Sequence, residues 1–107
     1  MRSELADDED MRELILEYVS ELPVRTATMR GLAAANQLEA LRAIAHQLKG
    51  TGGGYGYPSI TRAAASLEGA IVAEAPESVL LERLELLIGC CESAVTGLVR
   101  NPGEAAD

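Results

Sequence analysis

Helical periodicity runs almost unbroken along the sequence and constrains the fold more than any other feature. Apolar residues recur every three or four positions from Asp7 to Arg100, and no segment shows the alternation that is typical of a half-buried strand. Aromatic residues make up only 3% of the chain, with no Trp or Phe, so the core must consist mainly of Leu, Ile, Val and Ala. We therefore expect an all-α protein.

Breaks in this pattern predict five helices. Pro23 should kink or end the first helix and open the second, because proline lacks the amide hydrogen that a helix interior needs. Asn36 can cap the second helix and open the third, and Glu39 three residues later gives a pattern that resembles a capping box. Gly52 to Gly54 should fray or end that helix, and the last two helices should begin at Pro58 and Pro76. Such short connections favour an antiparallel up-down-up-down four-helix bundle with an additional N-terminal helix.

The length of 107 residues predicts a single domain over residues 1–107. We expect an ordered core over about 7–100 and a disordered tail over residues 101–107. Met1 and the short flanks favour a free-standing protein over a domain of a larger kinase.

Charge and hydropathy exclude several classes of partner. A net charge of −8 repels a polyanionic backbone, so we expect no nucleic acid. There is no apolar run of the roughly 20 residues that a membrane span needs, and the acidic N-terminus does not resemble a signal peptide, so we expect no membrane and a cytoplasmic location. The adjacent Cys90 and Cys91 are interpreted as core residues in a reducing compartment, and one His with one Cys pair predicts no metal site.

His46 is the only histidine, and the helical pattern predicts that it faces outward. At about 100° per residue, the apolar stripe from Leu41 to Leu48 lies within roughly 60° of Leu41, whereas His46 lies about 140° away. Helical spacing places Arg42, Lys49, Gly50 and Gly53 on the same face.

This grouping has a chemical interpretation. A neutral imidazole offers a nucleophilic lone pair near neutral pH, and the Lys49 ammonium can stabilise an incoming anionic group. Gly50 leaves the ring open to a second protein, which explains a glycine in the middle of a helix.

The segment from His46 to Gly50, read His-Gln-Leu-Lys-Gly, with Gly56, Ile60 and the pair Leu67-Glu68 downstream, resembles the motif of histidine-containing phosphotransfer (HPt) domains. In that family a His-x-Leu-Lys-Gly segment lies in a five-helix arrangement with a four-helix core. The glycines that follow Thr51 depart from the family pattern, which usually has Ser and Ala there.

The resemblance implies a phosphorelay intermediate. His46 would be phosphorylated at Nε2, with Lys49 stabilising charge and Gly50 giving access. The phosphoryl group would come from an aspartyl phosphate of one response-regulator receiver domain, or of a hybrid sensor histidine kinase, and would pass to another receiver aspartate. The receiver would supply the Mg²⁺, so the chain itself would need no cofactor and would be a monomeric carrier, not an enzyme.

The partner surface is expected around the histidine. Its predicted residues are Arg42, Ala43, Gln47 and Gly53.

Two other functions remain open at this point. A helical interaction or dimerisation module without phosphorylation would be favoured by a buried His46, or by exposure of Leu81, Leu86 and Ile88. An autonomous hydrolase with His46 as base is disfavoured, because no Ser, Cys or carboxylate is placed by the pattern to complete a nucleophile and base pair.

Overall fold

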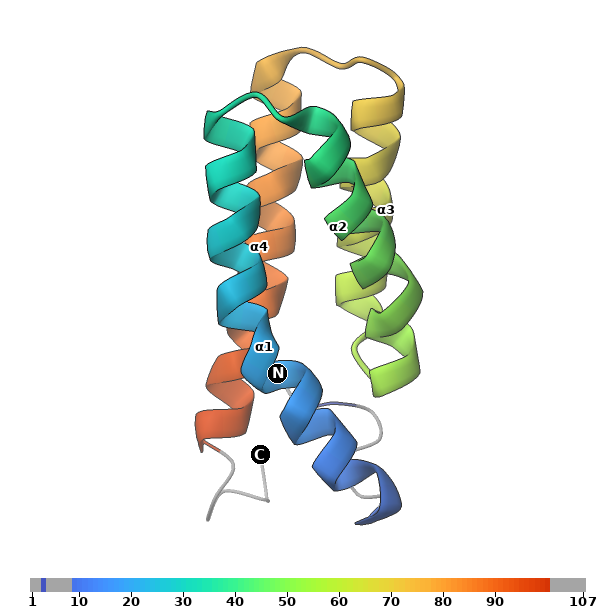
Figure 1. Cartoon of the computed structure of the whole chain (residues 1–107). Coiled ribbons are helices and arrows are strands. Elements are labelled where there is room, and N and C mark those ends of the chain that lie inside the picture. Colours follow the sequence, from blue (N-terminus) through green and yellow to red (C-terminus); the bar gives the residue numbers. More distant parts are fainter. Residues whose placement is uncertain (1–2, 4–8, 101–107) are drawn as a thin grey trace.

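In the computed structural model, the described part of the chain forms four α-helices and one short 3₁₀ turn (Figure 1). The structure describes Ser3 and residues 9–100, so the predicted tail lies outside the described residues. No helix in this described part is both long and apolar enough to cross a membrane. The elements are α1 (Glu9–Ala34), α2 (Leu38–Gly52), the 3₁₀ turn η1 (Gly53–Tyr55), α3 (Pro58–Val72) and α4 (Glu77–Arg100).

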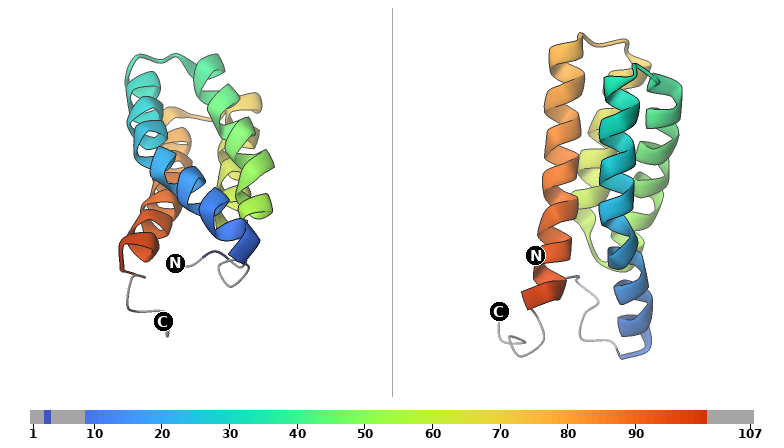
Figure 2. Two further views of the ribbon diagram at one scale, coloured as in Figure 1. Left: turned by 60° about the horizontal axis from the view of Figure 1, so that its bottom comes forward. Right: turned by 60° about the vertical axis from the view of Figure 1, so that its left-hand side comes forward.

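The helices run up, down, up and down, as the short connections predict (Figures 1 and 2). Each helix packs against its neighbours in the chain, and α4 closes the bundle against α1. The all-α, antiparallel four-helix bundle is thus confirmed.

Of the two outcomes expected at Pro23, a kink or an end of the helix, the end is wrong, because α1 continues through this residue and no second helix begins there. The ring of Pro23 removes one hydrogen bond to the carbonyl of Val19, but its fixed φ still suits a helix. Val19 and Leu22 before it and Met29 after it are fully buried, so core packing holds both halves of α1 in one helix. The predicted additional N-terminal helix is the first half of α1, which leans toward the lower ends of α2 and α3 (Figure 1).

Asn36 closes α1 and does not open α2. It adopts a left-handed conformation with φ 58°, and the amide of Gln37 donates to the carbonyl of Leu32 at 2.8 Å, as in a Schellman motif. The N-cap of α2 is Gln37, which makes no side-chain capping bond. Glu39 instead accepts hydrogen bonds from Arg42, so the predicted capping box does not form.

The core is aliphatic, as the composition predicts. The stripe of α2 buries Leu41 and Leu48, and the thiol of Cys91 lies fully buried on α4, where burial raises its pKa to about 12. Cys90 is half-buried, and both cysteines are free. The buried aliphatic residues of α3 and α4 include Ile60, Ala64, Leu67, Ile71, Leu80, Leu84, Leu87 and Ala94.

The glycine-rich end of α2 is held by close packing on α3. A Cβ atom on Gly52 would lie 2.9 Å from the backbone nitrogen of Thr61 and 3.0 Å from Cβ of Ile60. Only a glycine therefore lets the two helices approach at this point. By contrast, a Cβ atom on Gly50 would have nothing within 4 Å.

This difference predicts opposite effects of two alanine substitutions in one helix. Gly52→Ala should lower the free energy of unfolding by about 1–3 kcal/mol, because the new methyl group overlaps the backbone of α3. Gly50→Ala should preserve or raise it by up to about 1 kcal/mol, because alanine favours a helix interior. Urea denaturation followed by circular dichroism measures both, and equal stabilities of the two variants would contradict the close approach at Gly52.

Candidate functional site

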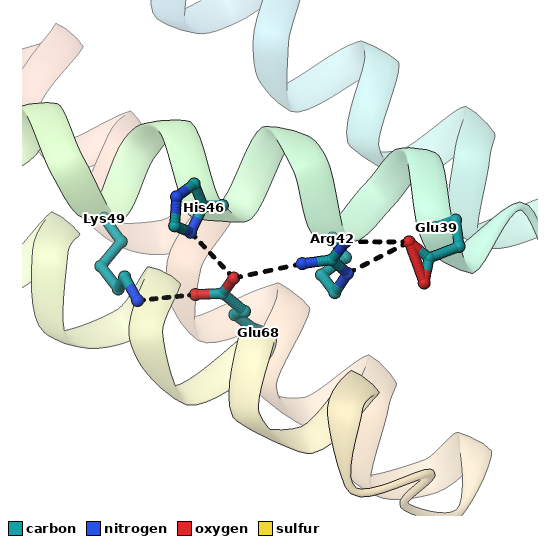
Figure 3. A network of polar contacts seen from close by, with 5 residues as sticks. All are labelled: Glu39, Arg42, His46, Lys49 and Glu68. Carbon is teal, nitrogen blue, oxygen red and sulfur yellow. Dashed lines mark hydrogen bonds and ion pairs between the residues drawn. The ribbon is translucent and has the colours of Figure 1, made fainter.

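His46 projects from α2 with 64% of its side chain exposed, as the helical pattern predicts. Its Nδ1 lies 2.9 Å from Oε2 of Glu68 on α3 (Figure 3). An ionised carboxylate only accepts hydrogen bonds, so Nδ1 of the ring carries the hydrogen. The neutral ring then holds its lone pair on Nε2, on the side of the imidazole away from Glu68.

Lys49, the only lysine of the chain, binds the same carboxylate. Its Nζ lies 2.8 Å from Oε1 of Glu68, so each oxygen of one carboxylate serves one of the two α2 side chains. Glu68 is only 13% exposed, whereas Lys49 is 40% exposed. The carboxylate thus lies beneath the two side chains and fixes both on the outer face of α2.

The electrostatics of the pair follow from this geometry. The hydrogen bond from Lys49 holds the pKa of Glu68 below its usual value, and the bond from His46 acts in the same direction, while burial opposes both. Glu68 therefore stays ionised at neutral pH, which is the state that accepts the Nδ1 hydrogen.

Arg42 extends the network along α2 (Figure 3). Its guanidinium donates to Oε1 of Glu39 at 3.0 and 3.2 Å and lies 3.6 Å from Oε2 of Glu68. The carboxylate of Glu39 raises the pKa of Arg42. Two basic side chains, those of Arg42 and Lys49, thus flank His46.

The remaining predicted residues lie around the ring to different degrees. Gly50, Ala43 and Gln47 are exposed, and the amide of Gln47 accepts a hydrogen bond from Arg25 of α1. Gly53 is also exposed, but its backbone amide donates to the hydroxyl of Thr61 on α3.

Three tyrosines pack together at the end of the bundle that contains the glycine-rich turn. The rings of Tyr18 and Tyr55 stack with centroids 4.3 Å apart, and Tyr57 is buried beside them. The hydroxyl of Thr51 on α2 lies 3.1 Å from that of Tyr18. This cluster ties the first half of α1 to the glycine-rich turn.

Glu68 and Thr61 have contacts that the pattern of residues did not predict. In the sequence, Glu68 is recognisable only as part of the family motif, and no sequence pattern indicates a role for Thr61. Both act across the contact between α2 and α3, so their partners depend on how the two helices are aligned. The only signal in the sequence was a carboxylate next to the core residue Leu67.

Metal-ligating side chains do not cluster in the described part of the chain, where no group of three or more His, Cys, Asp or Glu residues could hold an ion.

A family model described as Hpt domain matches residues 13–97, which is most of the chain. Comparisons with curated proteins and with solved structures find no match.

Glu68 should make the stability of the protein depend on pH. Its pKa is lower in the folded than in the unfolded state, so its contribution is fully present above the unfolded value of about 4.3 and is lost as the pH falls through the folded value. We expect Glu68→Gln to remove the part of the acid-induced loss of stability that is due to Glu68. Urea midpoints measured between about pH 7 and pH 3 would show a shallower dependence than in the wild type.

The matched control is Glu92→Gln, which removes a carboxylate from an exposed position on α4. If both variants depended on pH to the same extent, the ion pair at Glu68 would not be present in solution.

Proposed function

This chain belongs to the Hpt domain family, and we propose that it carries phosphoryl groups between receiver domains through His46. Domains of this family are phosphocarrier modules of phosphorelay signalling and not autonomous enzymes. The observation that carries the proposal is the hydrogen bond from Nδ1 of His46 to Glu68, because it leaves Nε2 exposed and unprotonated in the neutral ring.

In the proposed reaction, the Nε2 lone pair of His46 attacks the phosphorus of an aspartyl phosphate. The N–P bond forms as the P–O bond breaks, and the electron pair of that bond leaves on the aspartate carboxylate. Transfer to a second receiver reverses these steps. Phosphorylation at Nε2 leaves positive charge on the imidazole, which Glu68 stabilises through the Nδ1 hydrogen.

Lys49 supplies the charge that an incoming phosphoryl group needs. The chain as a whole carries a net charge of −8, which repels anions. Lys49 and Arg42 instead place two positive charges around His46, the only histidine of the chain. With the Mg²⁺ expected in the receiver, the carrier needs no cofactor of its own, because phosphoryl transfer depends mainly on positioning and charge stabilisation.

Packing within the chain does not require a glycine at position 50, because a Cβ atom there would have nothing within 4 Å. Access for the receiver to His46 would explain Gly50 instead. We place the receiver against Arg42, Ala43, Gln47 and Gly53.

We expect this contact to continue into the adjoining groove between α1 and α2. The groove has a volume of about 410 Å³ and contains Ile44 and Val24, of which Val24 is 69% exposed. Arg25 lines this groove and donates a hydrogen bond to Gln47, and this connection favours one partner over both surfaces. We propose a monomer that acts in the cytoplasm, where it would exchange phosphoryl groups with receivers or with a hybrid kinase.

A dimerisation module is the second candidate, and one observation favours it. Leu81 and Leu86 on α4 are 45% and 59% exposed. Ile88, the third residue expected on this flank, is buried, so the apolar surface is smaller than the sequence suggests. The exposure of His46 also removes the first condition for this alternative. An elution volume in gel filtration that corresponds to a monomer over a wide concentration range would exclude it.

Incubation with a phosphorylated receiver domain tests the carrier proposal. We expect acid-labile, base-stable phosphate on the wild-type chain and none on His46→Gln. Lys49→Met should slow the transfer by at least about tenfold, because it removes the cation beside the acceptor nitrogen.

The matched control for Lys49→Met is Arg62→Met, which removes the same charge from an exposed position on α3 and should transfer at the wild-type rate. Phosphate that remains on His46→Gln would refute the assignment of His46. An equal loss in both cation variants would contradict a local role of Lys49.

A further inference from the structure

We infer that Thr61 is a positioning residue of the His46 site, because its hydroxyl holds the backbone of Lys49 where the ammonium group reaches Glu68. The importance of this role for phosphoryl transfer rests on the proposed function. The positioning of Lys49 by Thr61 does not depend on that function.

The hydroxyl of Thr61 bridges two backbone groups of α2. The amide of Gly53 donates to Oγ1 of Thr61 at 2.7 Å, and Oγ1 donates to the carbonyl of Lys49 at 2.9 Å. In a continuing α-helix the amide of residue i+4 bonds directly to the carbonyl of residue i, and Gly53 and Lys49 are such a pair. A hydroxyl group from α3 thus bridges the donor and the acceptor of such a pair at the end of α2.

This bridge coincides with a change of helix type. The α-helix ends at Gly52, and the 3₁₀ turn begins at Gly53. The backbone of Thr61 lies close to α2 at this place, because a Cβ atom on Gly52 would lie only 2.9 Å from its nitrogen. The hydroxyl is thus presented to α2 at the point where the two helices approach closely.

Lys49 is consequently held by α3 at two places. Its carbonyl accepts from Thr61, and its Nζ binds Glu68 at 2.8 Å. Thr61 and Glu68 are seven residues apart, which places them on one face of α3, two helical turns from each other. A lysine side chain loses rotamer entropy when it is held in one conformation, so a backbone held at Lys49 assists the ion pair.

Titration of Glu68 by carbon-13 NMR separates positioning from a merely structural role. The hydrogen bond from Lys49 is the main cause that lowers the pKa of Glu68. If Thr61 positions Lys49, Thr61→Val should shift the Glu68 midpoint upward, toward that of Lys49→Met. Thr61→Ser keeps the hydroxyl and should retain the wild-type midpoint.

The matched control is Thr28→Val on α1, whose hydroxyl also donates to a backbone carbonyl, that of Val24, at 2.8 Å. It should leave the midpoint of Glu68 unchanged. Circular dichroism verifies that each variant is folded, and Thr61→Ala replaces Thr61→Val in the titration if the valine variant does not fold.

The inference would be overturned if a folded Thr61→Val or Thr61→Ala protein kept the wild-type midpoint, because Thr61 would then serve stability alone. An unchanged midpoint in Lys49→Met would also overturn it, since Lys49 would then not be held on Glu68.

Transfer from a phosphorylated receiver adds the functional result. We expect Thr61→Val to slow phosphorylation of His46 by about tenfold and Thr61→Ser to restore it. If the titration shows the expected shifts but the wild-type chain accepts no phosphate, the proposed function fails and the positioning role stands.

Discussion

The carboxylate of Glu68 is the interaction on which the site depends. One oxygen accepts the Nδ1 hydrogen of His46, and the other binds the ammonium group of Lys49. The two α2 residues are three positions apart, so they already share a helix face, but only a group from α3 can fix both from below. The geometry of the site is therefore the geometry of the contact between α2 and α3.

Much of the fold serves this contact. Gly52 lets the two helix backbones approach, and Thr61 bonds across the same place. At the other side of the turn, Gly56 takes a left-handed conformation with φ 88°, which reverses the chain into α3. The tyrosine cluster around Tyr18 closes this end of the bundle. The glycines after Thr51 thus belong to a packed turn, and α2 ends among them at Gly52, as the sequence predicts.

The ammonium group of Lys49 is paired with a carboxylate, so an incoming phosphoryl group would compete with this carboxylate for the positive charge. Lys49 already binds Glu68, so a phosphoryl group on Nε2 would share its ammonium group with the carboxylate. A shared cation stabilises the incoming anion without holding it as tightly as a free one would. This arrangement suits a carrier, which must release its cargo to the next receiver as readily as it accepts it.

The sequence predicted those features that depend on a single helix. The 3.6-residue period placed His46 outward and Leu41 and Leu48 inward, and Pro58 marked the start of α3. It failed where packing from elsewhere decides the outcome. Pro23 stays within α1 because buried residues on both sides hold the helix, and the roles of Glu68 and Thr61 depend on the alignment of two helices, which no local pattern encodes.

The most direct test of the account is nitrogen-15 NMR of the His46 ring before and after phosphorylation by a receiver. At a pH where the ring is neutral, we predict a hydrogen on Nδ1 and none on Nε2, and then a phosphorus–nitrogen coupling at Nε2 with the Nδ1 hydrogen retained. A neutral ring protonated at Nε2, or a coupling at Nδ1, would contradict the claim that Glu68 presents Nε2 for transfer.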